Sequence, residues 1–286
     1  NNKFKRTISK TFISVTAASM LTVTAAGGVA IADDNDWPTG TVNFVMHTQA
    51  GGSADVFIRT LAETMEPMIG QQIVIINSPG GAGATQMSRI RSAKPDGLTL
   101  GINTLSHFTG MLTNLNGVFA LDDFDWIASA QEDVHIVFSR SETGIESVGE
   151  LLEKAGNGSE KVIVGGFGPE GSTQNIAISM LENEADVEFE WIAYNGTPDI
   201  IAAVMGGHVD VGISNLSALK SFFDADRIQG VGVIADERLE GLPDVPTFAE
   251  QGVDIDTGWV QVRGVFGPAG IPMETQQQIA DAFHEA

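Results

Sequence analysis

Short runs rich in β-branched residues alternate with amphipathic stretches from residue 41 onward. Segments 42–47 (VNFVMH) and 71–77 (QQIVIIN) have the composition of strands, and the amphipathic segment 54–70 between them is typical of a helix. The same alternation predicts further strands at 98–103, 124–130, 134–139, 161–166, 187–194, 209–214 and 229–235, and further helices at 84–93, 147–156, 172–182 and 197–207. This order predicts an α/β fold with parallel-sheet character.

The chain of 286 residues is 43% hydrophobic, which is enough for one large domain or two lobes. No stretch marks a flexible linker between independent domains. Two lobes that share strands would leave no such linker, so this arrangement fits the pattern.

The first residues have the three parts of a secretory signal. Four basic residues precede an apolar stretch over 11–30, which ends in Ala30-Ile31-Ala32. We predict a signal peptide over 1–32 with cleavage after Ala32, the alternative being a membrane anchor. The chain has no cysteine for a lipid anchor or a disulfide, so we expect a freely diffusing periplasmic protein.

The formal net charge of −22 argues against nucleic acid as a partner. An acidic excess also repels an anionic ligand at long range. It is therefore expected to keep the surface hydrated, which suits a saline habitat.

Two glycine-rich turns follow predicted strands and lead into predicted helices. In the first, Ala50 to Ser53, glycines allow backbone N–H groups to approach a ligand and the helix N-terminus carries partial positive charge. The second, Gly165 to Asn175, has the same design. Both turns predict anion seats without a basic residue, although a turn needs glycine for steric reasons alone in many proteins.

The second turn also matches a dinucleotide-binding pattern through Gly166, Gly168 and Gly171. Pro169 removes a backbone donor from this loop, and Glu170 would place a negative charge beside a pyrophosphate. A dinucleotide-dependent enzyme is therefore the weakest of the functional alternatives, and no cofactor is expected.

Several further motifs occur in a fixed order along the mature chain. They are Trp37-Pro38, the AGGSAD run from Ala50 to Asp55 followed by Arg59, the NSPGGAG run from Asn77 to Gly83, the PDGLTL run from Pro95 to Leu100, Tyr194-Asn195-Gly196, the GGHVD run from Gly206 to Asp210, and the run from Leu242 to Gly252. In this order they resemble the substrate-binding receptors of tripartite tricarboxylate transporters, also called Bug receptors.

The resemblance implies a periplasmic binding protein type II-like fold, with two α/β lobes around a central cleft that closes over a small carboxylate. The expected lobes are 33–136 plus 237–286 and 137–236. The implied function is delivery of a di- or tricarboxylate, or a related organic acid, to membrane permease subunits by a monomeric receptor. A ligand-sensing partner of a sensor kinase is the alternative.

The candidate ligand-binding residues lie in or beside these motifs, and Phe167, Trp191 and Tyr194 are expected to face the cleft. The full set is His47, Thr48, Ala50, Gly51, Gly52, Ser53, Asp55, Ser106, Phe167, Gly168, Ser172, Thr173, Tyr194, Asn195, Gly196 and Asn215.

Some residues depart from the family pattern. His47 lies just before the first turn, where many members of the family have apolar residues. Glu170 beside the second turn allows for an amino group on the ligand. The chain stops at Ala286 inside an expected helix, which suggests a truncated or short variant.

No catalytic residue or metal site is predicted. The serines lack a nucleophile elbow, and the histidines show no metal-ligand spacing. Arg263 is expected near a strand end in a surface ion pair.

Overall fold

The computed structural model describes residues 37–141, 145–158 and 161–286. The predicted signal at 1–32 and its cleavage site lie outside these residues. Among the residues that are described, no helix is long and apolar enough to cross a bilayer.

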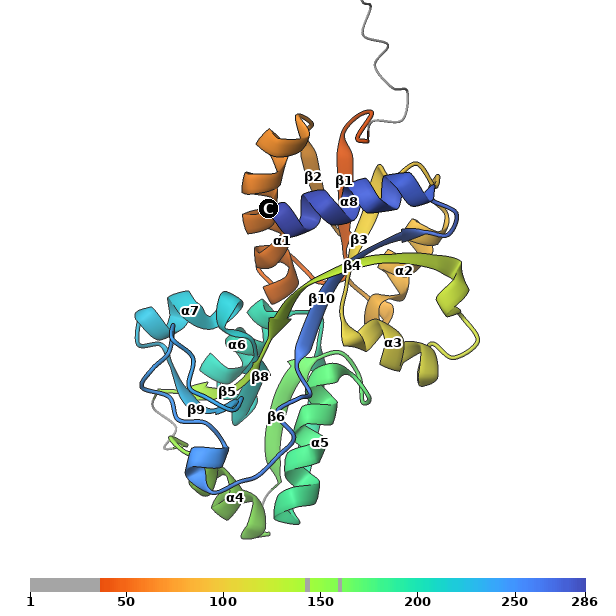
Figure 1. Cartoon of the computed structure of the whole chain (residues 1–286). Helices are drawn as coiled ribbons and strands as arrows, with labels where there is room; N and C mark the ends of the chain where they lie inside the picture. Colours follow the sequence, from red (N-terminus) through yellow and green to blue (C-terminus); the bar gives the residue numbers. More distant parts are fainter. Residues whose placement is uncertain (1–36, 142–144, 159–160) are drawn as a thin grey trace, which may run out of the picture. The chain divides into compact units, whose positions relative to one another are not determined.

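Two five-stranded sheets carry the described part of the chain (Figure 1). The first has the strand order β2-β1-β3-β10-β4 and the second the order β7-β6-β8-β5-β9. In each sheet three neighbouring strands are parallel, the fourth (β10 or β5) runs against them, and the edge strand beyond it (β4 or β9) runs in their direction again. The bounds are β1 Val42–Met46, β2 Ile73–Asn77, β3 Thr99–Asn103, β4 Phe124–Asp133, β5 His135–Arg140, β6 Val162–Phe167, β7 Phe189–Tyr194, β8 Val211–Ser214, β9 Ile228–Ile234 and β10 Gln261–Pro268.

Helices cover both faces of each sheet because strand residues point alternately to either side. In β1, Phe44 packs towards α1 and α8, whereas Val45 packs towards α2 and α3. The second sheet has α4 and α5 on one face and α6 and α7 on the other. The helices are α1 Ser53–Ile69, α2 Ala84–Arg91, α3 Leu105–Leu112, α4 Val148–Gly156, α5 Thr173–Ala185, α6 Thr197–Met205, α7 Leu216–Asp224 and α8 Met273–Glu285, with 3₁₀ turns η1 Gly81–Gly83, η2 Leu121–Asp123 and η3 Ala249–Gln251.

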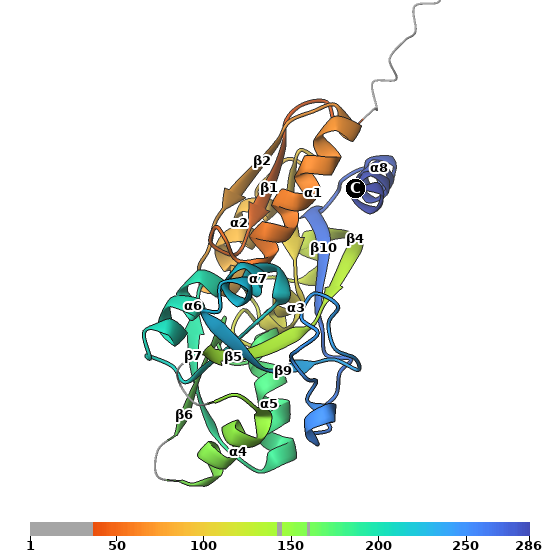
Figure 2. The same cartoon turned by 90° about the vertical axis from the view of Figure 1, so that its left-hand side faces the viewer.

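The strands β4 and β10 connect the two sheets. They pair antiparallel from Gln261 opposite Asp133 to Pro268 opposite Phe124, and they lie side by side in both views (Figures 1 and 2). Only Val134 separates β4 from β5, so the chain passes from one sheet to the other without a linker.

The predicted α/β class is confirmed, as are strands at all nine predicted positions. The pattern missed α3, α7 and the full extent of β10. The helices α3 and α7 have eight and nine residues, and since α2, α4 and α6 are equally short and were predicted, length does not explain why they were missed.

The expected lobe boundaries stay a prediction, but the packing favours moving one of them. Val245 and Phe248 lie in the cores of the second sheet, and Val233 forms a β-bridge with Thr247. This packing places the segment up to about Trp259 with the second sheet rather than with the first.

Arg263 is buried, so the expectation of a surface ion pair is wrong. Its side chain has no exposed area, and Nη1 donates to Asp133 Oδ2 at 2.8 Å and to Gln131 Oε1 at 2.6 Å. Arg263 Nε and Nη2 have no partner among the described residues. Because β10 lies between β3 and β4 and is covered on both faces, nearly all its side chains are buried, polar ones included.

His135, at the start of β5, is also fully buried, and neither ring nitrogen has a partner in the described structure. Burial first, and the positive charge of Arg263 second, lower the pKa of His135 to about 4. Between pH 6.5 and about 4 the unfolded chain therefore binds a proton that the folded protein does not. The free energy of unfolding decreases as the pH is lowered through this window.

We expect His135→Leu to keep or raise stability at pH 7, because it removes two unpaired buried nitrogens. It should also reduce the loss of stability between pH 7 and pH 5 by about 2 kcal/mol. Urea unfolding at the two pH values measures both effects, with the exposed His208→Gln as control. An unchanged pH dependence in His135→Leu would contradict this account.

Candidate functional site

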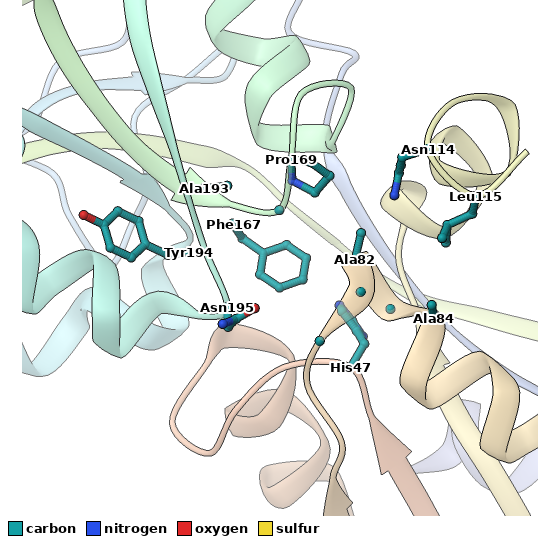
Figure 3. A pocket seen from close by; sticks show the side chains of 14 residues that line it. His47, Ala82, Ala84, Asn114, Leu115, Phe167, Pro169, Ala193, Tyr194 and Asn195 are labelled. Carbon is teal, nitrogen blue, oxygen red and sulfur yellow. The ribbon is translucent and has the colours of Figure 1, made fainter.

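A cavity of about 460 Å³ lies where the carboxyl ends of parallel strands from the two sheets meet (Figure 3). One side is formed by His47 and the turn after β2, and the other by Phe167 and the residues at the end of β7. The lining residues are His47, Gly80, Gly81, Ala82, Gly83, Ala84, Asn114, Leu115, Phe167, Gly168, Pro169, Ala193, Tyr194 and Asn195. This edge is where α/β sheets commonly bind ligands.

The turn from Gly80 to Gly83 contributes backbone donors to the cavity. All four residues have positive φ, including the non-glycine Ala82 at 55°. The N–H groups of Gly81 and Ala82 open the 3₁₀ turn η1 and so have no partner within it, and α2 starts directly afterwards at Ala84. Free backbone N–H groups beside a helix N-terminus are donors of the kind that anions bind.

This turn was recognised in the sequence only as a family motif and was not among the predicted ligand residues. Three glycines within seven residues at the end of a predicted strand were the signal that could have identified it.

Phe167, at the end of β6, forms the opposite wall, and its ring points towards Ala82 and His47 (Figure 3). The loop behind it rests on Trp191, whose Nε1 donates to the Gly168 carbonyl at 3.0 Å. A Cβ at Gly166 would lie 2.0 Å from the Trp191 ring. Packing on this ring therefore explains the first glycine of the dinucleotide-like pattern.

Trp191 and Tyr194 were expected to face the cleft, and their side chains do not. Trp191 packs beneath the loop, and the Tyr194 ring packs with Val209 in a core of the second sheet, directed away from Phe167 (Figure 3). Strand alternation sends these side chains away from the cavity, which Tyr194 lines at the very end of β7.

The first glycine-rich turn uses its own donors. Gly51 N–H donates to Asp55 Oδ2 at 2.9 Å and Gly52 N–H donates to the Gln49 carbonyl at 3.1 Å. Ala50, Gly51, Gly52 and Asp55 line neither the large cavity nor the two smaller ones beside it. The turn instead packs against the start of α6, where a Cβ at Gly51 would lie 3.4 Å from Pro198.

Asp55 is a structural acceptor in this turn. Its buried carboxylate accepts from Gly51 N–H, from Arg59 and from Asn77 Nδ2. Burial alone would raise the pKa of Asp55, but the hydrogen bonds from Arg59, Gly51 and Asn77 together lower it.

Four predicted ligand residues contact one another between the two sheets. Ser53 Oγ donates to Asn215 Oδ1 at 3.3 Å, and Ser106 Oγ lies 2.8 Å from Thr173 Oγ1. Thr173 N–H also donates to Ser106 Oγ, which occupies one donor at the start of α5.

A second cavity, of about 20 Å³, lies on the other side of Phe167 and His47 and is surrounded mainly by polar side chains. Its lining residues are His47, Thr48, Ser53, Ala54, Thr104, Ser106, Phe167, Gln174, Gly196, Thr197, Asn215 and Gln261. A third hollow of about 10 Å³ contains Ser172. The large cavity, this polar cavity and the third hollow thus contain eleven of the sixteen predicted residues, and Thr173 contacts Ser106 beside them.

His47, which lines both the large cavity and the polar cavity, packs against the ring of His107. The rings of His47 and His107 meet edge to face with centroids 4.6 Å apart, and His47 lies 5.4 Å from the Phe167 ring. His107 Nδ1 accepts from Thr104 N–H, and its Nε2 donates to Gln86 Oε1 at 2.7 Å, because Gln86 Nε2 already donates to two carbonyls. Burial lowers the pKa of His107 to about 4 and that of His47 well below its usual value, so both rings are neutral at pH 7.

The linings of these three cavities contain no acidic or basic side chain other than the neutral His47. Glu170, which the sequence suggested could approach the ligand, borders a separate hollow beside Trp191. Within the described residues no group of three or more histidine, aspartate or glutamate side chains has the geometry of a metal site. The site therefore offers dipoles and hydrogen bonds rather than charges.

The family model of the tripartite tricarboxylate transporter family receptor matches residues 57–286. The chain belongs to this receptor family. This finding confirms the resemblance that the ordered motifs carry.

Relatives from several bacteria match along most of the chain. The "UPF0065 protein in gbd 5'region" of Cupriavidus necator is 25% identical over 278 residues, which cover 95% of this chain and 83% of that protein. BugT of Bordetella pertussis is 22% identical over 235 residues, covering 80% and 71%.

Solved structures share the fold. An R. palustris protein solved with adipate is 25% identical with a TM-score of 0.78, covering 87% of this chain and 83% of that one. MatC from Rhodopseudomonas palustris, solved with malate, is 24% identical with the same TM-score, covering 87% and 85%. These similarities confirm the predicted two-lobed periplasmic binding protein fold.

We expect Asp55→Asn to lower the free energy of unfolding by about 2–3 kcal/mol, because the amide turns a donor towards groups that are themselves donors. Chemical denaturation measures the change. The exposed Asp254→Asn should stay within about 0.5 kcal/mol of the parent. Equal stability of the two variants would show that Asp55 does not hold the turn.

Proposed function

We propose that this chain is a periplasmic receptor that captures a small carboxylate and delivers it to the membrane permease of a tripartite tricarboxylate-type transporter. The observation that carries the proposal is the uncharged cavity with backbone donors of Gly81 and Ala82 on one wall and Phe167 on the other. A carboxylate held by backbone N–H groups makes charge-assisted hydrogen bonds without a buried cation.

Short-range contacts have to provide this affinity. The net charge of −22 repels anions, but salt screens that repulsion beyond about 8 Å at physiological ionic strength. At contact distance, each hydrogen bond to a charged group contributes about 1.5–3 kcal/mol.

A ligand between the two sheets would favour closure because it would contact both walls only when they approach each other. The pairs Ser53–Asn215 and Ser106–Thr173 would then form part of the closed interface. Gln49 Nε2, which donates to Asp199 Oδ2 at 2.5 Å, adds a third contact at the rim.

The chemical class follows from the cavity and from the relatives. The adipate in the related R. palustris structure is a dicarboxylate, which is small enough for a 460 Å³ cavity. Residues 1–32 would direct export to the periplasm, where we expect a monomeric receptor that docks on permease subunits and acts by binding alone.

Mass spectrometry of small molecules released from the natively purified protein on denaturation would identify a retained ligand. Release of an organic acid would support the proposal.

Ala82 offers the sharpest test of the anion seat. Its Cβ points into the cavity (Figure 3), and its positive φ is one that Asp and Asn adopt more readily than most residues. We expect Ala82→Asp to weaken carboxylate binding at least about tenfold, since repulsion of about 1.4 kcal/mol suffices. Isothermal titration calorimetry with a panel of di- and tricarboxylates measures the change.

The matched variant Ala82→Asn has the same size and no charge, so it should lose far less affinity than Ala82→Asp. Circular dichroism establishes that both variants fold. Equal affinity of the two variants for the carboxylate would place the anion elsewhere.

A further inference from the structure

Two adjacent residues that line the 20 Å³ polar cavity each carry a buried polar atom with no hydrogen-bond partner. These atoms are Nδ1 of His47 and Oγ1 of Thr48, which lie in side chains that are 3% and 5% exposed. Buried polar atoms have a hydrogen-bond partner in the great majority of cases. Two such atoms without a partner beside a cavity therefore indicate that a bound group forms hydrogen bonds with them.

His47 can only accept at this nitrogen. A hydrogen bond with the Ile102 backbone, whose carbonyl is the available acceptor, uses the N–H of the neutral imidazole. The other ring nitrogen, Nδ1, then carries a lone pair. An ionised carboxylate oxygen has no hydrogen to offer this nitrogen, so a carboxylate does not fit here.

Thr48 supplies the complementary group. Asn77 Nδ2 donates to the Thr48 carbonyl at 3.0 Å and so fixes the backbone beside His47. The unpaired hydroxyl of Thr48 can donate to a group that itself donates to His47. A hydroxyl oxygen, with one hydrogen and two lone pairs, satisfies both residues at once.

The size and charge of the cavity favour a hydroxyl over an ammonium group. Its volume of about 20 Å³ exceeds the roughly 10–15 Å³ that one water-sized group requires. No acidic side chain lines it to balance a positive charge. His47 and Phe167 also line the 460 Å³ cavity, so one ligand can reach from the carboxylate seat to this point.

We propose that His47 and Thr48 form a subsite that reads a hydroxyl group on the carboxylate ligand, which makes the substrate a hydroxy acid. The hydroxyl donates to His47 Nδ1 and accepts from Thr48 Oγ1. This inference rests on the proposed carboxylate-binding function and narrows its substrate class.

Calorimetry with matched pairs of acids tests the subsite. Each pair differs by one hydroxyl: L-malate and succinate, citrate and tricarballylate, mandelate and phenylacetate. In at least one pair the wild-type protein should bind the hydroxy acid more than tenfold more tightly, because the deoxy partner leaves buried polar groups unpaired. Equal binding within every pair, or preference for the deoxy acid, overturns the proposal.

Three variants assign the preference to these residues. Thr48→Val, which is nearly isosteric, and His47→Leu should each bring the ratio within a pair towards one, mainly by weakening the hydroxy acid. The exposed His208→Gln should keep the wild-type ratio. If His47→Leu does not fold, Thr48→Val decides, and an unchanged ratio in Thr48→Val overturns the proposal.

The same calorimetry distinguishes a failure of the proposed subsite from a failure of the proposed receptor function. A wild-type protein that binds carboxylates without regard to the hydroxyl refutes the subsite and leaves the receptor function intact. A protein that binds no carboxylate refutes the receptor function, and the subsite with it.

Discussion

The antiparallel ladder between β4 and β10 is the constraint on which the rest of the structure depends. It joins a strand that leaves the first sheet for the second to the strand that returns, so both sheets meet at the carboxyl ends of their parallel strands. Arg263 and Asp133 form a buried ion pair at this crossing. Burying such a pair costs desolvation energy, and we infer that its benefit is to fix the register of two strands that pass between separate cores.

The crossing determines the chemistry of the cleft. All the helix N-termini that follow parallel strands point towards the same interface, and their backbone donors provide polarity where the linings contain no charged side chain. A strongly acidic protein can therefore hold an anion, because the attraction is confined to contact distance while the repulsion is screened. Among the described residues, the buried cation Arg263 lies outside the linings of these cavities. After burial and the neighbouring His107, its positive charge helps to lower the pKa of His47.

The sequence predicted the fold well because the fold depends on periodicity and on turn chemistry. Every strand expected from β-branched runs formed, and the ordered motifs identified the receptor family. The site was harder to predict because facing residues from distant segments cannot be seen along one chain. Ser53 and Asn215, which were predicted as ligand contacts, line the polar cavity and also hydrogen-bond to each other across the two sheets. The ring of Tyr194 is directed by its strand into a core.

Two glycine-rich turns follow strands of the first sheet, one at Gly51 and one at Gly81. Local sequence alone does not show which of them could bind an anion. Both follow a parallel strand and precede a helix, so helix polarity and backbone flexibility are alike in the two. They differ in whether the chain supplies its own acceptor. Asp55 lies four residues after Gly51 and takes its N–H, whereas the turn at Gly81 is followed by Ala84 and Thr85, neither of which carries a carboxylate. A glycine-rich turn is therefore open to an external anion only where no internal acidic side chain reaches its donors, a criterion that the turn from Gly80 to Gly83 meets and the turn at Gly51 does not.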